Sequence, residues 1–223
     1  DDDTVVPMEL IRSAMGRDVA LSASAPIVWG LDVARFGGDN SALCVRQGNT
    51  VLDIVTFPSM DLMQLCGAVK NKFDDSTAIE QPSEILVDVI GLGSGVVDRL
   101  AEQGLPVRGV NVAEAPATKK NYLNLRAELW FAVKDWLAQR NCRLPENDEL
   151  ASELAAPLYK YTSSGKIKIE SKDEMRKRGI KSPDKADALA LTMASSAASF
   201  GGSGSHFGYN FKKPLKSRIF RVG

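Results

Sequence analysis

The sequence predicts one compact α/β domain, in which a mixed central sheet of three antiparallel strands plus parallel strands carries helices on both faces. Three short apolar runs follow one another closely at 26–34, 41–47 and 50–57, which is typical of an antiparallel meander. Two later runs, at 84–91 and 105–112, alternate with helical patterns, and such crossovers favour parallel strands. A hydrophobic content of 44% and a charged content of 25% over 223 residues are those of an ordinary globular protein.

Turn residues and helical spacing mark the other elements. Gly48 and Asn49 form a hairpin turn between the second and third strands. Gly165 marks the bend of a further hairpin at 161–170. Pro183 stands in the first turn of the last helix, beside acidic residues that suit the positive end of a helix. Apolar residues at helical spacing predict more helices, at 61–73, 94–104, 121–140 and the start of 147–161.

Composition divides the chain into a lead-in segment at 1–25, the compact domain at 26–198, and a basic, Gly/Ser-rich tail at 199–223 that we expect to be flexible. The net charge is zero, but the tail holds five lysine and arginine residues and no acid. A neutral total therefore leaves room for a polyanionic partner. No apolar run approaches the roughly 20 residues of a membrane span and no secretory signal opens the chain, so we expect an intracellular protein without a membrane partner.

Cysteine and histidine chemistry is not indicated. The three cysteines are an odd number without CxxC spacing, which favours neither a disulfide framework nor a thiolate zinc site. His206 is the only histidine, and it lies in the tail, far from any serine-rich strand turn. A Ser-His-Asp triad is therefore not expected.

Four aspartates stand out, two inside apolar strand runs and two at the start of the last helix. Asp32 interrupts the apolar run PIVWGLDVA and Asp88 interrupts EILVDVIG, and a carboxylate on a core strand must be paired, hydrogen-bonded or bound to a metal. Asp184 and Asp187 lie three residues apart, on one face at the start of the last helix. If the first and fourth strands are neighbours, these carboxylates converge.

A divalent cation would relieve the repulsion between such carboxylates, and all-oxygen ligation favours Mg²⁺ or Mn²⁺ over zinc. Two such ions roughly 3.5–4 Å apart would bind a phosphodiester, activate a water and stabilise the leaving oxygen. A plainer interpretation also exists. A strand aspartate can accept hydrogen bonds from backbone amides at a turn, and the last pair can cap a helix.

A family resemblance is carried, in this order, by GLDVARFGGDNSALCVRQG, ILVDVIGLGSGVVDRL and KSPDKADALALT. In these motifs and their spacing, the chain resembles the nuclease domain of the large terminase subunit of tailed bacteriophages. The resemblance covers about residues 26–198. It implies the RNase H-like fold that Holliday-junction resolvases, transposases and integrases share. It also implies metal-dependent endonucleolytic cleavage of concatemeric double-stranded DNA during genome packaging. Asp32, Asp88 and Asp187, with Asp184 beside it, match the family's catalytic and metal-binding positions.

The resemblance further implies roles and partners. Asp32 would bridge two Mg²⁺ or Mn²⁺ ions, Asp88 and Asp187 would each hold one, and Asp184 would assist. The expected partners are double-stranded DNA, the phage portal and the small terminase subunit, in the host cytoplasm. The family's full-length chain begins with a packaging ATPase, but no GxxxxGK[ST] phosphate loop is present here, so residues 1–25 would be the end of a linker from a missing ATPase domain.

Several neighbouring residues have both a functional and a plainer interpretation. Asn40 and Ser41 are candidates to place the scissile phosphate. Asp39 fits a turn, and GLGSG at 91–95 fits a tight strand-to-helix turn better than a nucleotide loop. Glu128 is a candidate auxiliary acid but fits a solvated helix face better. Basic residues crowd the approach to the last helix, where DNA-phosphate contact competes with simple solvation: Lys172, Arg176, Lys177, Arg178, Lys181 and Lys185.

Other functions stay open from the sequence alone. Another RNase H-like nuclease, such as a resolvase, would use the same acids. An actin-like ATPase also opens with a strand aspartate and a glycine-rich hairpin, but that family needs two duplicated halves and only one such hairpin is present. A non-catalytic module would keep a vestigial acidic pocket and use the basic tail to dock DNA or the portal.

Overall fold

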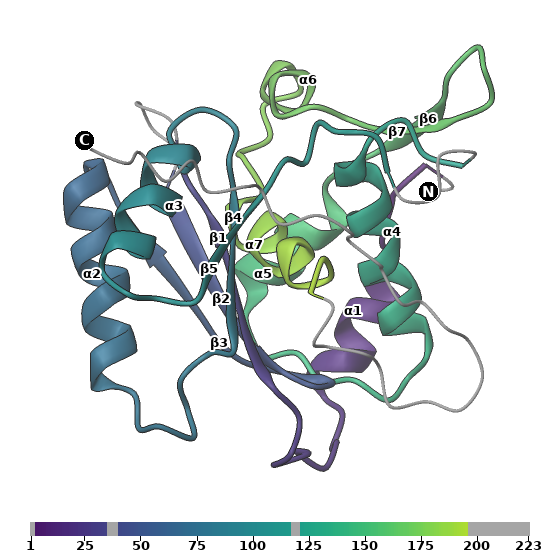
Figure 1. Ribbon diagram of the computed structural model, residues 1–223. Helices are drawn as coiled ribbons and strands as arrows, with labels where there is room; N and C mark the ends of the chain where they lie inside the picture. The colour runs from purple at the N-terminus through teal and green to yellow at the C-terminus, as the bar shows by residue number, and fades with distance from the viewer. Residues whose placement is uncertain (1–2, 35–39, 117–120, 196–223) are drawn as a thin grey trace.

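The structure is a computed structural model that describes residues 3–34, 40–116 and 121–195 (Figure 1). Its main sheet consists of β1 (Ile27–Asp32), β2 (Ser41–Gln47), β3 (Thr50–Phe57), β4 (Glu84–Asp88) and β5 (Val107–Val110). The strand order is β3-β2-β1-β4-β5. β1, β2 and β3 pair antiparallel, whereas β4 lies parallel to β1 and β5 parallel to β4. The predicted mixed sheet is confirmed.

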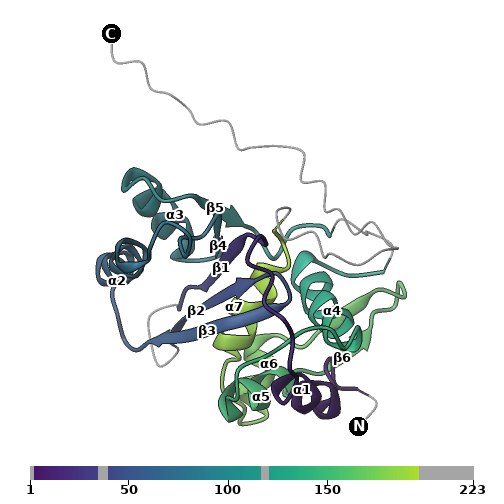
Figure 2. The same ribbon diagram turned by 90° about the horizontal axis from the view of Figure 1, so that it is seen from below.

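Helices cover both faces of the sheet, as predicted (Figure 1, Figure 2). On one face, α2 (Leu62–Asp75) and α3 (Gly93–Glu102) enclose one hydrophobic core. On the other face α7 (Asp184–Thr192) lies across β1 and β2. An outer layer of α1 (Met8–Met15), α4 (Leu125–Ala138) and α5 (Asp148–Ala155) packs around α7 and completes the second core.

A small hairpin and a short helix stand apart from the main sheet. β6 (Tyr159–Tyr161) and β7 (Ile167–Ile169) pair antiparallel, and Gly165 lies in their turn with a φ of 75°, as the sequence predicts. α6 (Lys172–Lys177) follows and was not predicted, because six residues hold too few apolar positions to show helical spacing. Its sequence signal is the capping box formed by Ser171 and Glu174.

The alternation of side chains along β1 directs Asp32 toward α7. Trp29 and Leu31 lie in the core beneath α2 and α3, so Gly30 and Asp32 face the other side of the sheet. A Cβ atom at Gly30 would overlap the backbone carbonyl oxygen of Ala188 in α7. Glycine therefore lets the helix cross β1 at close range, and this brings the first turn of α7 beside Asp32.

A buried arginine fastens the far end of α7 to β2. Arg46 Nε donates to Thr192 Oγ1 at 2.8 Å, and Nη2 donates to the carbonyl oxygen of Thr192 at 2.8 Å. Burial lowers the pKa of Arg46 to about 10. With the close crossing over β1 at one end and this clamp at the other, α7 is fixed on the sheet.

The described residues of the lead-in segment at 1–25 pack with the rest of the domain. This segment contains α1, and several of its apolar side chains belong to the core. Val5 and Val6 are fully buried in the same hydrophobic core as side chains of α4, α5 and α7, and Thr4 forms a β-bridge with Leu158. The reason is that its apolar side chains pack against α4 and α5. Where the domain boundaries lie stays a prediction.

Some expectations concern residues outside the described ranges: Asp39, His206 and the tail at 199–223. The helix predicted at 121–140 begins only at Leu125, because Asn124 caps it by accepting a hydrogen bond from the N–H of Ala127 at 3.0 Å. Within the described ranges, none of the helices combines the length and the apolar character that crossing a bilayer requires.

Candidate active site

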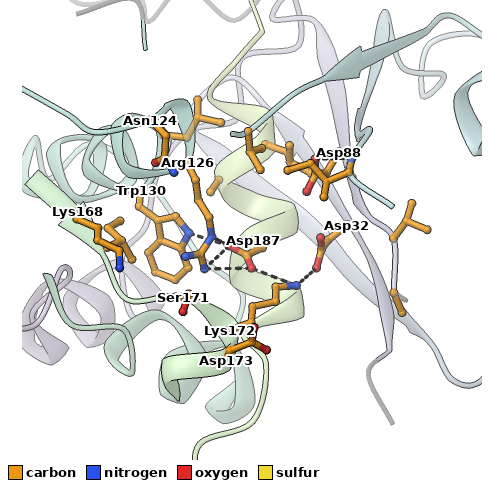
Figure 3. Close-up of a pocket in the computed structure, with 18 of the residues that line it drawn as sticks. Asp32, Asp88, Asn124, Arg126, Trp130, Lys168, Ser171, Lys172, Asp173 and Asp187 are labelled. Carbon is orange, nitrogen blue, oxygen red and sulfur yellow. Dashed lines mark hydrogen bonds and ion pairs between the residues drawn. The ribbon is translucent and has the colours of Figure 1, made fainter. Parts of the chain in front are cut away.

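A pocket of about 360 Å³ opens where the carboxyl ends of β1 and β4 meet α4, α6 and α7 (Figure 3). Asp32 and Asp88 line it from the two strands, Asp187 from α7, and Arg126 and Trp130 from α4. The carboxyl ends of parallel strands are the usual location of ligand sites in α/β proteins. The topology thus gathers polar side chains from distant parts of the chain into one cavity.

Asp32 and Asp88 end two adjacent parallel strands, as the sequence predicts. The register brings them to the same level, one residue beyond the last paired residues of β1 and β4. Asp88 Oδ1 accepts the N–H of Ile90 at 3.1 Å, so the turn after β4 orients the carboxylate. A Cβ at Gly93 would overlap the carbonyl oxygen of Asp88. The GLGSG run is therefore the predicted tight strand-to-helix turn.

Asp184 and Asp187 open α7, and both are buried. Asp187 lines the pocket, whereas Asp184 does not. Asp184 is instead tied to neighbouring segments. Its Oδ1 accepts from the hydroxyl of Ser182, and its Oδ2 accepts from the backbone N–H of Asn40 at 3.2 Å. Of the pair, Asp187 is the carboxylate that faces the cavity.

The ammonium group of Lys172 lies between carboxylates from two elements (Figure 3). Its Nζ is 2.9 Å from Asp32 Oδ2, 3.4 Å from Asp184 Oδ1 and 3.4 Å from Asp187 Oδ2. Burial alone would lower the pKa of Lys172, but the three carboxylates raise it. Lys172 therefore stays charged and offsets the repulsion between the acids.

The pocket carboxylates differ in their affinity for protons. Burial raises the pKa of Asp32 to about 7, against the opposing charge of Lys172. Burial also raises the pKa of Asp88, although the hydrogen bond from its turn opposes this. Burial would raise the pKa of Asp187 as well, but the cations beside it lower it. Carboxylates with separated pKa values in one cavity are typical of functional sites.

Two partners of Asp187 were missed from the sequence. Trp130 Nε1 donates to Asp187 Oδ1 at 2.8 Å, and Arg126 Nη2 donates to the same oxygen at 3.0 Å. Both residues lie on α4, four positions apart and hence on one face of the helix. An arginine and an indole N–H on a face that is otherwise apolar were the available signal.

The other candidates near the motifs are mostly engaged. Glu128, expected on a solvated face, is 2% exposed, which corrects that interpretation. The reason is that α4 packs against both α7 and α1. The hydroxyl of Ser41 accepts the N–H of Ala34 at 3.0 Å, and the backbone of Asn40 holds Asp184. A role for Asn40 and Ser41 in placing a phosphate stays a prediction.

The basic residues before α7 and in its first turn fall into two groups. Lys172 and Arg176 line the pocket, and Lys181 is exposed. Arg178 instead forms two hydrogen bonds, of 2.7 and 2.6 Å, with a glutamate of the preceding segment. Lys185 is buried in an ion pair with a glutamate of α5. Phosphate contact stays a prediction for Lys172, Arg176 and Lys181, although Lys172 also pairs with the pocket acids. Arg178 and Lys185 are held by glutamates instead.

In their present positions, no three histidine, cysteine, aspartate or glutamate side chains of the described ranges form a group that could hold a metal ion. The donor set nevertheless fits a hard divalent cation, because Asp32, Asp88 and Asp187 offer only oxygen. The ammonium group of Lys172 stands in for such a cation between Asp32 and Asp187. The residues present therefore fit Mg²⁺ or Mn²⁺.

Solved structures with a similar fold are nuclease domains of phage large terminase subunits. The nuclease domain of the large terminase subunit gp2 of bacterial virus Sf6 has a TM-score of 0.72 at 21% sequence identity, covering 85% of this chain and 97% of that one. The large terminase nuclease of thermophilic phage G20c has a TM-score of 0.64 at 14% identity, covering 86% and 98%. That of Thermus phage P74-26 has a TM-score of 0.62 at 12% identity, covering 88% and 96%.

Metals are present in some of these structures. A mutant of the Sf6 nuclease domain was solved with manganese, and the G20c nuclease was solved with bound magnesium and with bound cobalt. No protein-family model matches the present sequence, and no curated protein does. At identities of 12 to 21%, the likeness establishes the fold. The RNase H-like fold that the sequence motifs predict is confirmed.

Proposed function

We propose that this chain is the nuclease domain of a phage DNA-packaging terminase and that it cuts concatemeric double-stranded DNA by metal-dependent phosphodiester hydrolysis. The observation that carries the proposal is the meeting of Asp32, Asp88 and Asp187 in one pocket, from two adjacent strand ends and a crossing helix. The fold supports it, since the similar solved structures are nuclease domains of phage terminases. The substrate and the endonucleolytic mode are part of the proposal.

Asp32, Asp88 and Asp187, assisted by Asp184, are the residues that would hold two Mg²⁺ or Mn²⁺ ions. Such ions supply an activated water and charge stabilisation for the leaving oxygen. Manganese and magnesium in the similar nuclease domains support the same choice of cofactor here. Oxygen-only donors also favour these ions over zinc.

The other pocket residues would keep the aspartates charged and oriented for metal binding. Lys172 holds them together while no metal is present, because its ammonium group offsets their repulsion. Arg126 and Trp130 keep Asp187 ionised and oriented. Asp32, whose pKa is about 7, has to release a proton before it can ligate a cation. These groups thus set the charge of the site before DNA arrives.

Double-stranded DNA is the proposed partner of the pocket mouth. Lys168 and Arg176 line the pocket, and Lys181 is exposed three residues before Asp184, so cationic side chains accompany the acids that would otherwise repel phosphate. Binding through such contacts weakens strongly with salt. We further propose that the domain works beside an ATPase domain, the portal and the small terminase subunit in the host cytoplasm, as the sequence resemblance implies.

The test of the proposed function is plasmid nicking with Mn²⁺ or Mg²⁺. The wild-type chain should nick supercoiled DNA, and EDTA or the substitution Asp32→Ala should abolish nicking. Asp53→Asn is a matched control, because this β3 carboxylate pairs with Lys72 away from the pocket. Nicking that survives both EDTA and Asp32→Ala would overturn the proposal.

One observation favours a second candidate, a non-catalytic module that docks DNA or the portal. Lys172 already pairs with Asp32 and with both aspartates of α7, so part of the charge of the acidic cluster is compensated without a metal. Equilibrium binding of Mn²⁺ separates the two functions. A catalytic domain should bind the ion through Asp32 and lose it in Asp32→Ala, whereas a docking module should bind DNA but no Mn²⁺.

A further inference from the structure

The two oxygens of the Asp187 carboxylate have different surroundings. Oδ1 accepts from Trp130 Nε1 at 2.8 Å and from the Nη2 and Nε atoms of Arg126 at 3.0 and 3.2 Å. Oδ2 receives a weaker contact from Arg126 Nη2 at 3.3 Å and lies 3.4 Å from Lys172 Nζ. In Figure 3 the α4 side chains lie on one side of Asp187 and Lys172 lies on the other. Oδ1 is therefore occupied by α4, and Oδ2 is directed to the pocket.

Arg126 also links this carboxylate to the segment that carries Lys172. Its Nη1 donates to the carbonyl oxygen of Glu170 at 2.9 Å, two residues before Lys172. Its guanidinium carbon lies 5.8 Å from the centroid of the Trp130 ring, so the two donors also support each other. All three guanidinium nitrogens of Arg126 thus serve groups around Asp187.

Packing alone does not account for this arrangement. The side chains of Arg126 and Asp187 are 16% and 10% exposed, and burying an ion pair brings little net stability compared with a well-packed apolar pair. What a forked arginine and an indole N–H do provide is a fixed direction for the carboxylate. Carboxylates that ligate metals commonly accept hydrogen bonds from neighbouring groups that fix their orientation.

We infer that Arg126 and Trp130 are positioning residues that hold Asp187 through Oδ1 and leave Oδ2 as the single oxygen offered to a divalent cation. This inference rests on the proposed function, because it assigns the cation to the same pocket. It adds that Asp187 would contribute one oxygen to the cation, and that hydrogen bonds from α4 determine which of the two oxygens is available.

The test compares conservative variants of α4 in the full chain. Trp130→Phe keeps an aromatic ring and removes only the N–H, and Arg126→Lys keeps the charge and removes the fork. Trp136→Phe is a matched control, since this buried indole on the same helix donates to Asn49 Oδ1 at 3.3 Å. Mn²⁺ affinity is measured from the electron paramagnetic resonance signal of free Mn²⁺, thermal stability by circular dichroism, and nicking in parallel.

Trp130→Phe and Arg126→Lys should bind Mn²⁺ about 10- to 100-fold more weakly than wild type and nick more slowly. Trp136→Phe should match wild type in both assays. Arg126→Met, which lacks the charge, should be weaker still, so that lysine gives partial rescue. A purely structural role would lower the melting temperature of these variants without changing the Mn²⁺ affinity of the folded protein.

The outcomes separate the two levels of the proposal. Suppose that the wild-type chain binds Mn²⁺ and nicks DNA. If the folded Trp130→Phe and Arg126→Lys variants then bind Mn²⁺ as tightly as wild type, the positioning role is wrong and the proposed function stands. If the wild-type chain itself neither binds Mn²⁺ nor nicks DNA, the proposed function is wrong, and this inference is overturned with it.

Discussion

Nζ of Lys172 lies 2.9 Å from Oδ2 of Asp32, although the two residues are 140 positions apart in the sequence. The contact places a monovalent cation where the proposed function needs divalent ones. Lys172 and a metal ion therefore compete for Asp32. This relationship makes Lys172 the residue whose removal should separate stability from metal affinity.

Lys172→Met should destabilise the metal-free protein and tighten its binding of Mn²⁺. Stability falls because three carboxylates lose their counter-charge. The free energy of unfolding should drop by up to about 3 kcal/mol, the low end of the range for breaking a buried ion pair, because the lysine side chain is 31% exposed. Affinity rises because no ammonium group has to be displaced. Thermal melts without metal and calorimetric titration with Mn²⁺ measure the two effects.

Lys168→Met is the matched control, because this pocket lysine pairs with Glu174 instead of the aspartates. It should leave the affinity for Mn²⁺ near that of wild type. Weaker Mn²⁺ binding by Lys172→Met, in protein that remains folded, would contradict competition and would mean that Lys172 organises the acids for the ion.

The pH dependence of the site should follow Asp32. Burial raises the pKa of this group to about 7 from an ordinary value of 3.8. Between pH 3.8 and about 7, Asp32 is protonated in the folded protein but ionised in the unfolded chain. The free energy of unfolding therefore decreases as pH rises over this range, and the contribution of Asp32 is lost above about pH 7. A divalent cation must displace the same proton, so Mn²⁺ affinity should rise up to about pH 7 and level off above it.

Asp32→Asn separates this titration from others nearby. Burial also raises the pKa of Glu153 to about 7, and Glu153 is unchanged in the variant. Melting temperatures of the metal-free proteins between about pH 5 and pH 8 should therefore fall more steeply for wild type than for Asp32→Asn. Equal slopes would show that Asp32 does not titrate in this range.

Strand positions and their acids were predictable because they depend on local pattern. Asp32 and Asp88 interrupt apolar runs, and the parallel crossover between those runs brings the two strand ends together. Lys172 was a candidate for DNA contact, and that role stays a prediction. What the sequence did not indicate is that its ammonium group neutralises acids in the pocket. Charge runs carry no periodicity that tells which member turns inward. Its position is set by the packing of α6 beside the pocket, which involves residues far apart in the sequence.

For the α4 residues as well, the sequence did not indicate which groups they contact. The spacing of Arg126 and Trp130 predicts a shared face, but not which carboxylate that face meets. Glu128 was misjudged because a helix covered by α7 and α1 has almost no solvated side. Sequence pattern thus gives the acids and the strands, whereas the partners that orient the acids depend on how helices pack in three dimensions.

Lys181 and Arg178 should respond differently in DNA binding, although both lie in the same basic run. Lys181 is exposed, whereas the guanidinium of Arg178 is held by Glu170 at 2.6 and 2.7 Å. Lys181→Ala should weaken binding of duplex DNA and lower the slope of log affinity against log salt by about 1. Arg178→Ala should leave that slope unchanged. Fluorescence anisotropy at several salt concentrations measures it, and equal effects of the two variants would contradict the assignment.

Gly30→Ala should damage the site without touching any of its acids. A Cβ at residue 30 would overlap the Ala188 carbonyl oxygen and lie 2.9 Å from a side-chain carbon of Thr192, so α7 must move off β1. Such overpacking costs roughly 1–3 kcal/mol. The shift also carries Asp187 away from Asp32, so Mn²⁺ binding should weaken together with the melting temperature.

Gly67→Ala is the control for this substitution, because a Cβ there would meet no atom within 4 Å apart from the adjacent residues and backbone of its own helix. Gly67 lies inside α2, where alanine stabilises a helix by about 0.5–1 kcal/mol relative to glycine. The two variants should therefore shift the melting temperature in opposite directions, and only Gly30→Ala should change Mn²⁺ affinity. If Gly30→Ala melts and binds Mn²⁺ like wild type, the close crossing of α7 over β1 does not hold Asp187 beside Asp32.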